Sequence, residues 1–125
     1  MTLLTVEEIL RLHEKLLAAT GGAAGLRARG LLESAVYSAY AGFGAVEQYP
    51  TIEEKAARLA FSLVNNHAFV DGNKRVGILA MLVTLSLRGV SLRYTQEELI
   101  ALGLGIAEGT LQYRDILTWI CQHEI

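Results

Sequence analysis

The sequence predicts an all-α fold, a compact bundle of about six helices in a single domain over residues 1–125. Three Thr-x-x-Glu segments, which begin at Thr5, Thr51 and Thr95, have the pattern of a helix capping box. Apolar residues also recur at the three- and four-residue spacing of helices that bury one face. A length of 125 residues is that of one domain, and 52% hydrophobic residues exclude a disordered chain.

The first helix is predicted over residues 5–20, where one apolar stripe includes Val6, Ile9 and His13. The stripe places His13 among packing residues, so we expect it to have neither a catalytic nor a metal-binding role. The glycine pair that begins at Gly21 ends this helix because glycine is a poor helix former.

The remaining helices are predicted over 30–41, 51–67, 73–88, 95–108 and 111–122. The apolar stripe that starts at Ala56 continues to His67, which is therefore expected on the buried face. Gly89 and Gly109 stand where glycine commonly ends a helix. Residues 90–94 are expected to be a short extended piece.

Charge and composition exclude several classes of partner. The net charge is -2, with no basic cluster, which argues against nucleic acid as a partner. The longest uncharged apolar stretch, 76–87, is too short for a membrane span, and no leader pattern is visible at the N-terminus. The lone Cys121 excludes an internal disulfide, fits a reducing cytoplasm and is expected to be a buried apolar filler.

A turn over residues 68–72 separates two long predicted helices and precedes an unusual helix start. Lys74 and Arg75 lie in the first helical turn, although the positive end of a helix dipole disfavours cations. The free amides of a helix N-terminus bind anions, and two cations strengthen such a site for phosphate. Gly72 lets the backbone approach an anion closely, and Asn73 is suited to capping the helix or orienting the turn.

Asp71 and His67 add two further functions to this segment. A single carboxylate beside phosphate-binding groups is a usual way of holding Mg²⁺. Histidine is suited to accept a proton at neutral pH. Together these residues suggest phosphoryl or nucleotidyl transfer from a nucleoside triphosphate to a hydroxyl.

Each feature also has a plainer interpretation. A histidine on an apolar helix face is usually a core residue, Asp-Gly-Asn is a common turn, and cations in a first helical turn are often only solvated. A zinc site on His67 and Asp71 would lack further ligands at suitable spacing.

The segment resembles the signature of the Fic/Doc family, His-x-Phe-x-[Asp/Glu]-[Gly/Ala]-Asn-x-Arg. Further similarity extends over residues 30–35, 87–90 and 107–109, so the resemblance covers nearly the whole chain. It implies an all-α fold with this turn between two helices. The signature positions are occupied by His67, Phe69, Asp71, Gly72, Asn73 and Arg75.

The resemblance implies a role for each signature residue, with ATP as substrate and Mg²⁺ as cofactor. His67 would be the general base, and Asp71 would hold Mg²⁺ or orient the nucleophile. Phe69 would pack beneath the turn. The phosphates would be cradled by Gly72, Asn73, Lys74 and Arg75.

Two positions favour the Doc, or death-on-curing, branch of toxins in toxin–antitoxin systems. AMP-transferring members usually have glycine at the position of Lys74 and a second arginine at that of Ile78. The resemblance then implies a protein kinase that transfers the γ-phosphate of ATP to a threonine of translation elongation factor Tu and so arrests translation. AMP transfer and a catalytically idle binding partner are the alternatives, although an idle fold predicts loss of signature residues.

The resemblance also implies control by a separate antitoxin protein. Some members have a self-inhibitory pattern, [Ser/Thr]-x-x-x-Glu-[Gly/Asn]. The pattern fails here because Leu104 stands four residues before Glu108 and Gly109, where it requires serine or threonine. An antitoxin segment is instead expected on an apolar groove. Ala28 replaces an acid that the family often has, and residues 40–49 are a candidate flap over the target hydroxyl, or an ordinary loop.

Overall fold

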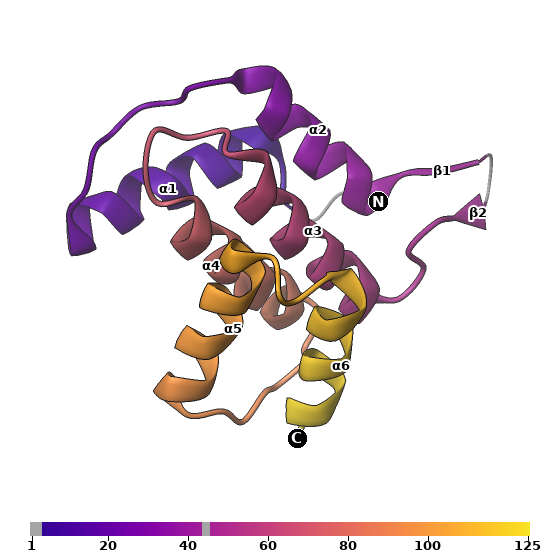
Figure 1. The fold of residues 1–125 in the computed structure, drawn as a ribbon. Coiled ribbons are helices and arrows are strands. Elements are labelled where there is room, and N and C mark those ends of the chain that lie inside the picture. The colour runs from indigo at the N-terminus through magenta and orange to yellow at the C-terminus, as the bar shows by residue number, and fades with distance from the viewer. Residues whose placement is uncertain (1–3, 44–45) are drawn as a thin grey trace.

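The computed structural model describes residues 4–43 and 46–125 and confirms the all-α prediction (Figure 1). Within these residues no helix is long and apolar enough to cross a membrane. A short antiparallel pair, β1 (Gly42–Phe43) and β2 (Val46–Glu47), interrupts the helices. The helices are α1 (Val6–Thr20), α2 (Arg29–Tyr40), α3 (Ile52–Asn66), α4 (Asn73–Leu87), α5 (Gln96–Glu108) and α6 (Tyr113–His123).

The three predicted capping boxes are all present. The hydroxyls of Thr5, Thr51 and Thr95 accept hydrogen bonds from amides three residues on at 3.2, 3.1 and 3.1 Å, and the glutamates bond back. The second helix starts differently, because its N-cap residue Ala28 provides no side-chain hydrogen bond. Helix α2 therefore begins with amides that no capping side chain satisfies.

Helices α3 and α4 form the centre of the bundle (Figure 1). Gly77 lets them approach closely, since a Cβ there would lie 2.7 Å from Val64 Cγ2 and 3.3 Å from Ala60 O. On one side they pack against α1 and α2, with Ile9, Leu32, Leu63 and Phe69 in the core. On the other side they pack against α5 and α6, with Met81, Leu102, Ile106, Ile116 and Ile120 in the core.

Two expectations for the C-terminal part have different outcomes. The extended piece at 90–94 is confirmed, because Leu92 forms an antiparallel bridge with Glu124. The expectation for Cys121 is wrong, because this side chain is exposed. Ile120 occupies the buried face of α6, and the next residue is turned about 100° around the helix axis.

The β1–β2 hairpin does not lie over the turn at 67–72, as the flap interpretation required. Figure 1 shows it projecting from the start of α3, whereas the turn follows the opposite end of this helix. Fifteen helical residues, about 22 Å, separate the two. The hairpin is tied to α3 by the buried Lys55, whose ammonium donates to Glu47 Oε2 at 2.9 Å and to the carbonyl of Tyr49.

Candidate active site

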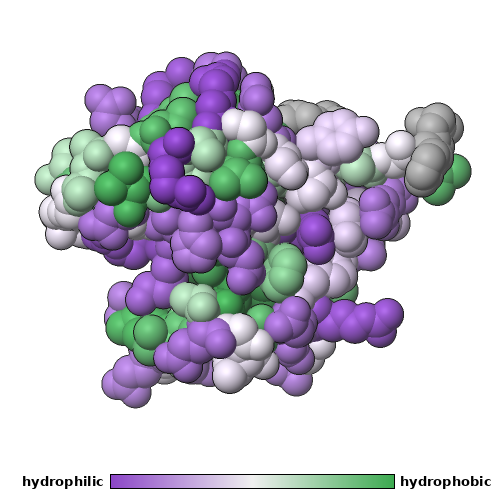
Figure 2. All heavy atoms as spheres, turned by 45° about the horizontal axis from the view of Figure 1, so that its top comes forward, coloured by the Kyte–Doolittle hydropathy of each residue, from purple (hydrophilic) through white to green (hydrophobic). Residues whose placement is uncertain are grey.

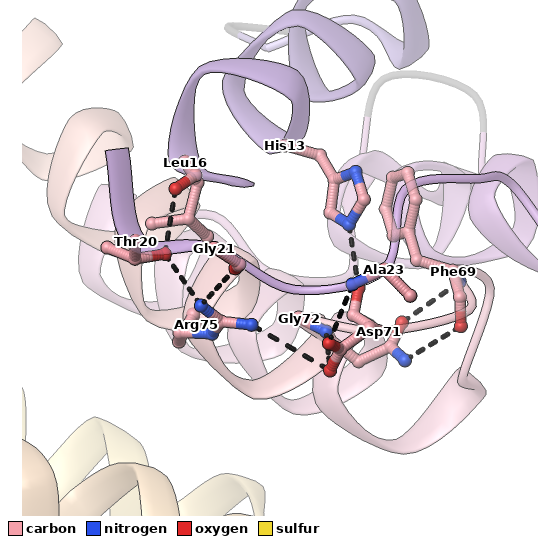
Figure 3. A network of polar contacts seen from close by, with 10 residues as sticks. His13, Leu16, Thr20, Gly21, Ala23, Phe69, Asp71, Gly72 and Arg75 are labelled. Atoms are coloured by element: carbon pink, nitrogen blue, oxygen red, sulfur yellow. Dashed lines mark hydrogen bonds and ion pairs between the residues drawn. The ribbon is translucent and has the colours of Figure 1, made fainter. Parts of the chain in front are cut away.

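The turn at 67–72 joins α3 to α4 and lies against the C-terminal half of α1 (Figures 1 and 3). Residues 21–28, here called the strap, run from α1 to α2 along this turn. Backbone hydrogen bonds join the two segments, so the strap fixes the course of the turn. Arg27 N–H and Ala28 N–H donate to Ala68 O at 2.7 and 2.9 Å, and Val70 N–H donates to Gly25 O at 3.0 Å.

His67 is exposed, so the expectation of a buried histidine is wrong. Helix α3 ends at Asn66, and His67 has φ 52° and ψ 47°, the left-handed conformation. It is the one non-glycine residue with positive φ among residues 4–43 and 46–125. The helical periodicity therefore stops one residue before the histidine. Arg27 Nε donates to the carbonyl of His67 at 2.8 Å, which helps hold this conformation.

Asn73 orients the turn and does not cap α4. Its side chain accepts from Phe69 N–H and donates to Phe69 O, both at 3.0 Å. The N-cap residue is Gly72, also left-handed with φ 80° and ψ 14°. Phe69 is buried beneath the turn as expected. Its ring stacks on that of His13, with centroids 3.7 Å apart and planes 13° apart.

The carboxylate of Asp71 accepts one backbone hydrogen bond on each oxygen (Figure 3). Ala23 N–H donates to Oδ2 at 3.1 Å, and Gly72 N–H donates to Oδ1 at 2.8 Å. These two amides lower the pKa of Asp71, and the nearby Arg75 adds to the effect. Asp71 is thus ionised at neutral pH.

The donor set around Asp71 fits Mg²⁺ held by one carboxylate, with phosphate and water as the other ligands. The side chain is half exposed, and each carboxylate oxygen keeps a lone pair beyond its amide contact. No group of three or more His, Cys, Asp or Glu side chains suited to a metal ion occurs in the described part of the chain.

Arg75 faces the end of α1. Its guanidinium donates to Thr20 Oγ1 at 2.6 Å and to Gly21 O at 3.1 Å, and lies 3.7 Å from Asp71 Oδ1 (Figure 3). A cation beside the last carbonyls of a helix interacts favourably with the helix dipole. Arg75 therefore joins α1, the strap and the turn.

Lys74 lies on the α5 side of α4 and, with Arg75, lines a groove of about 380 Å³ between α1, α4 and α5. Its aliphatic stem lies over Gly103, where an added Cβ would be 3.3 Å from Lys74 Cγ. Figure 2 shows apolar atoms recessed between the part formed by α5 and α6 and the part above it. The groove is lined by Leu16, Thr20, Lys74, Arg75, Ile78, Leu79, Leu82, Gln96, Leu99, Ile100 and Gly103.

Comparison with known proteins identifies the arrangement. Residues 3–85, well over half of the chain, match the model of the Fic/DOC family. The chain belongs to the Fic/Doc family. It is also similar to Toxin Doc of Mycolicibacterium smegmatis, with 45% identity over 74 residues. That match covers 59% of this chain and only 57% of the relative's length.

The Fic/Doc signature is thus assembled with help from residues outside it. Sequence reasoning missed His13, whose Nε2 lies 2.7 Å from Asp71 O, because its apolar stripe marked it as a packing residue. It also missed Gly22, where a Cβ would lie 2.7 Å from Asp71 Oδ2. The glycine pair was the available signal, but it was interpreted only as the end of a helix.

Proposed function

We propose that this chain is the toxin of a toxin–antitoxin system and transfers the γ-phosphate of ATP to a protein hydroxyl. Its proposed target is a threonine of translation elongation factor Tu, so that the transfer arrests translation. The observation that carries this proposal is that His67 is exposed and shares one turn with an ionised Asp71, directly before the N-terminus of α4. This arrangement supports the proposal, because a proton acceptor and an anion-binding end would then lie in one segment.

In the proposed reaction, His67 accepts the proton of the target hydroxyl as its oxygen bonds to the γ-phosphorus. The bond from this phosphorus to the β–γ bridging oxygen breaks, and ADP leaves. His67 suits this role because its ring is exposed and has no hydrogen-bond or ion-pair partner among the described residues. A base that acts on another protein has to be reachable from solvent.

The phosphates would lie at the N-terminus of α4, whose free amides and dipole favour anions. Lys74 would add charge from the groove side, and Arg75 from the α1 side. Asp71 would hold Mg²⁺, which would supply neutralisation of phosphate charge when bound. Arg75 would exchange contacts with Thr20 for contacts with phosphate, since both compete for the same guanidinium.

Lys74 supports γ-phosphate transfer over AMP transfer. A glycine in its place would leave room for a phosphate, whereas the lysine adds a four-carbon stem and a charge at the first turn of α4. AMP transfer is the alternative, and the label position in ATP distinguishes it.

The test is label transfer to elongation factor Tu with Mg²⁺ and ATP labelled at either the α or the γ phosphate. We expect label from the γ position only, and none with His67→Ala. His123→Gln is the matched control, because this histidine lies at the end of α6. Label from the α position would overturn the kinase proposal, and activity that survives His67→Ala would overturn the assigned base.

A second variant tests Lys74 itself. Lys74→Gly should abolish γ-phosphate transfer, whereas Lys15→Ala, at an exposed position on α1, should retain it. Undiminished transfer by Lys74→Gly would show that the lysine does not direct the reaction.

We also propose that an antitoxin segment occupies the groove between α1, α4 and α5. The groove is mainly apolar and has Lys74 and Arg75 at one side, which suits an apolar segment with an acidic residue. Ile100→Arg should weaken neutralisation of toxicity by the cognate antitoxin, whereas Ile125→Arg, at an exposed residue outside the groove, should not. Equal neutralisation of both variants would place the antitoxin elsewhere.

A further inference from the structure

His13 lies on α1, far in sequence from the signature, yet its ring enters the turn. The side chain is only 4% exposed. Its Nε2 lies 2.7 Å from the carbonyl oxygen of Asp71, and its ring stacks on Phe69 (Figure 3). A carbonyl only accepts hydrogen bonds, so Nε2 must carry the proton in this contact.

The carbonyl that His13 holds belongs to the peptide between Asp71 and Gly72. In a trans peptide the C=O and N–H point in opposite directions. Fixing the oxygen against α1 therefore directs the Gly72 N–H away from α1, where it reaches Asp71 Oδ1 at 2.8 Å. This amide stands at the N-cap of α4, where an anion would bind.

The same peptide is free to reverse unless something holds it. Gly72 has φ 80° and ψ 14°, the values of the third residue in a type II turn. Type I and type II turns differ by rotation of the peptide before this residue, and glycine adopts both conformations. Rotation would turn the carbonyl toward the anion-binding end and remove the amide from it.

We infer that His13 is a positioning residue that holds the Asp71–Gly72 peptide in the orientation that keeps the Gly72 amide on Asp71 Oδ1, at the end of α4 where the phosphates would lie. The inference rests on the proposed function for the identity of the anion. Phe69 supplies the surface on which the ring rests, since the two rings are nearly parallel. The hydrogen bond fixes the orientation of the Asp71–Gly72 peptide, whereas stacking alone would not fix it.

Two variants separate the hydrogen bond from the packing. His13→Gln retains an N–H donor about as far from the backbone as Nε2, whereas His13→Phe retains the ring on Phe69 and removes the donor. For each variant, kcat/KM for ATP in γ-phosphate transfer and the ¹H–¹⁵N signal of Gly72 without substrate are measured. Thermal unfolding is followed in parallel.

We expect His13→Phe to lower kcat/KM by about tenfold to a hundredfold and to shift the Gly72 amide signal. His13→Gln should stay within about threefold of the unsubstituted protein and retain the signal. A His13→Phe protein of equal activity, or a His13→Gln protein as impaired as His13→Phe, would overturn the inference.

The spectrum separates this inference from the proposed function. If the unsubstituted protein transfers no phosphate, the proposed function fails. The Gly72 signal alone then decides whether His13 orients the Asp71–Gly72 peptide. If His13→Phe does not fold, the ring ¹⁵N signals of the unsubstituted protein decide. A ring without a proton on Nε2 would refute the contact, and a protonated Nε2 with a coupling across the hydrogen bond to the carbonyl carbon of Asp71 would support it.

Discussion

The uncapped start of α2 provides a quantitative test of the local energetics. Ala28 is the N-cap residue, with φ −150° and ψ 101°, an extended conformation that aspartate adopts readily. Its side chain accepts no hydrogen bond, and the first turn of α2 contains no acidic residue. Ala28→Asp would supply a carboxylate acceptor to the amide of Gly30, or to that of Leu31, which now donates to Ala28 O at 3.2 Å. It would also place a negative charge at the positive end of the helix dipole.

We expect Ala28→Asp to raise the free energy of unfolding by about 1 kcal/mol, the typical difference between alanine and a good N-cap. The entropy of unfolding is about 2.1 cal/mol/K per residue, or about 0.26 kcal/mol/K for 125 residues. The melting temperature should therefore rise by about 4 °C.

The assay is thermal unfolding at neutral pH, followed by circular dichroism. Ala28→Asn should stabilise to a similar extent because its side-chain oxygen also accepts from these amides. Ala24→Asp adds the same charge in the strap at an exposed position outside any helix N-terminus, and should leave the melting temperature unchanged. No gain from Ala28→Asp, or an equal gain from Ala24→Asp, would refute the capping argument.

Three further predictions concern stability. The pKa of His123 is raised from 6.5, first by its hydrogen bond to Glu98. The stability that this bond contributes is therefore complete below pH 6.5 and is lost as the pH rises through the raised pKa of the folded protein. The melting temperature should fall more steeply from pH 6 to 9 for the unsubstituted protein than for His123→Gln. Gly77→Ala should cost about 1–3 kcal/mol in urea unfolding because its Cβ meets α3. Gly103→Ala should gain up to about 1 kcal/mol, because its Cβ would meet the flexible stem of Lys74 at 3.3 Å and Ile78 Cγ1 at an ordinary contact distance of 3.5 Å. Lys55→Ala should cost about 1–3 kcal/mol in the same assay, since its ammonium joins the hairpin to α3.

Most of the helical framework could be predicted because its signals are local. A Thr-x-x-Glu box acts within one turn of helix, and the boxes at Thr5, Thr51 and Thr95 all form. The β1–β2 hairpin was not predicted, because its two-residue strands are too short for an alternating pattern. Cys121 was misplaced because membership of an apolar helix does not determine which face a residue occupies.

The candidate site was only partly predictable. Asp71, Lys74 and Arg75 lie at the turn and helix start where the sequence placed them, but their directions depend on distant segments. Arg75 turns to Thr20 and Gly21 because the end of α1 offers oxygen acceptors. No pattern within residues 67–75 reveals the positions of α1 and the strap, so the contacts that orient the turn appear only in three dimensions.

The exposure of His67 shows why the error in the predicted end of α3 matters for function. Had α3 continued by one more turn, its apolar stripe would have carried the histidine into the core. The left-handed backbone at His67 ends the helix one residue earlier and leaves the ring in solvent, at a cost of about 1–2 kcal/mol for a non-glycine residue. The strap offsets this cost through Arg27, whose side chain holds the carbonyl of His67 and whose backbone amide holds that of Ala68. A residue in a costly conformation, held by neighbours and open to solvent, is better explained by a task at the surface than by packing.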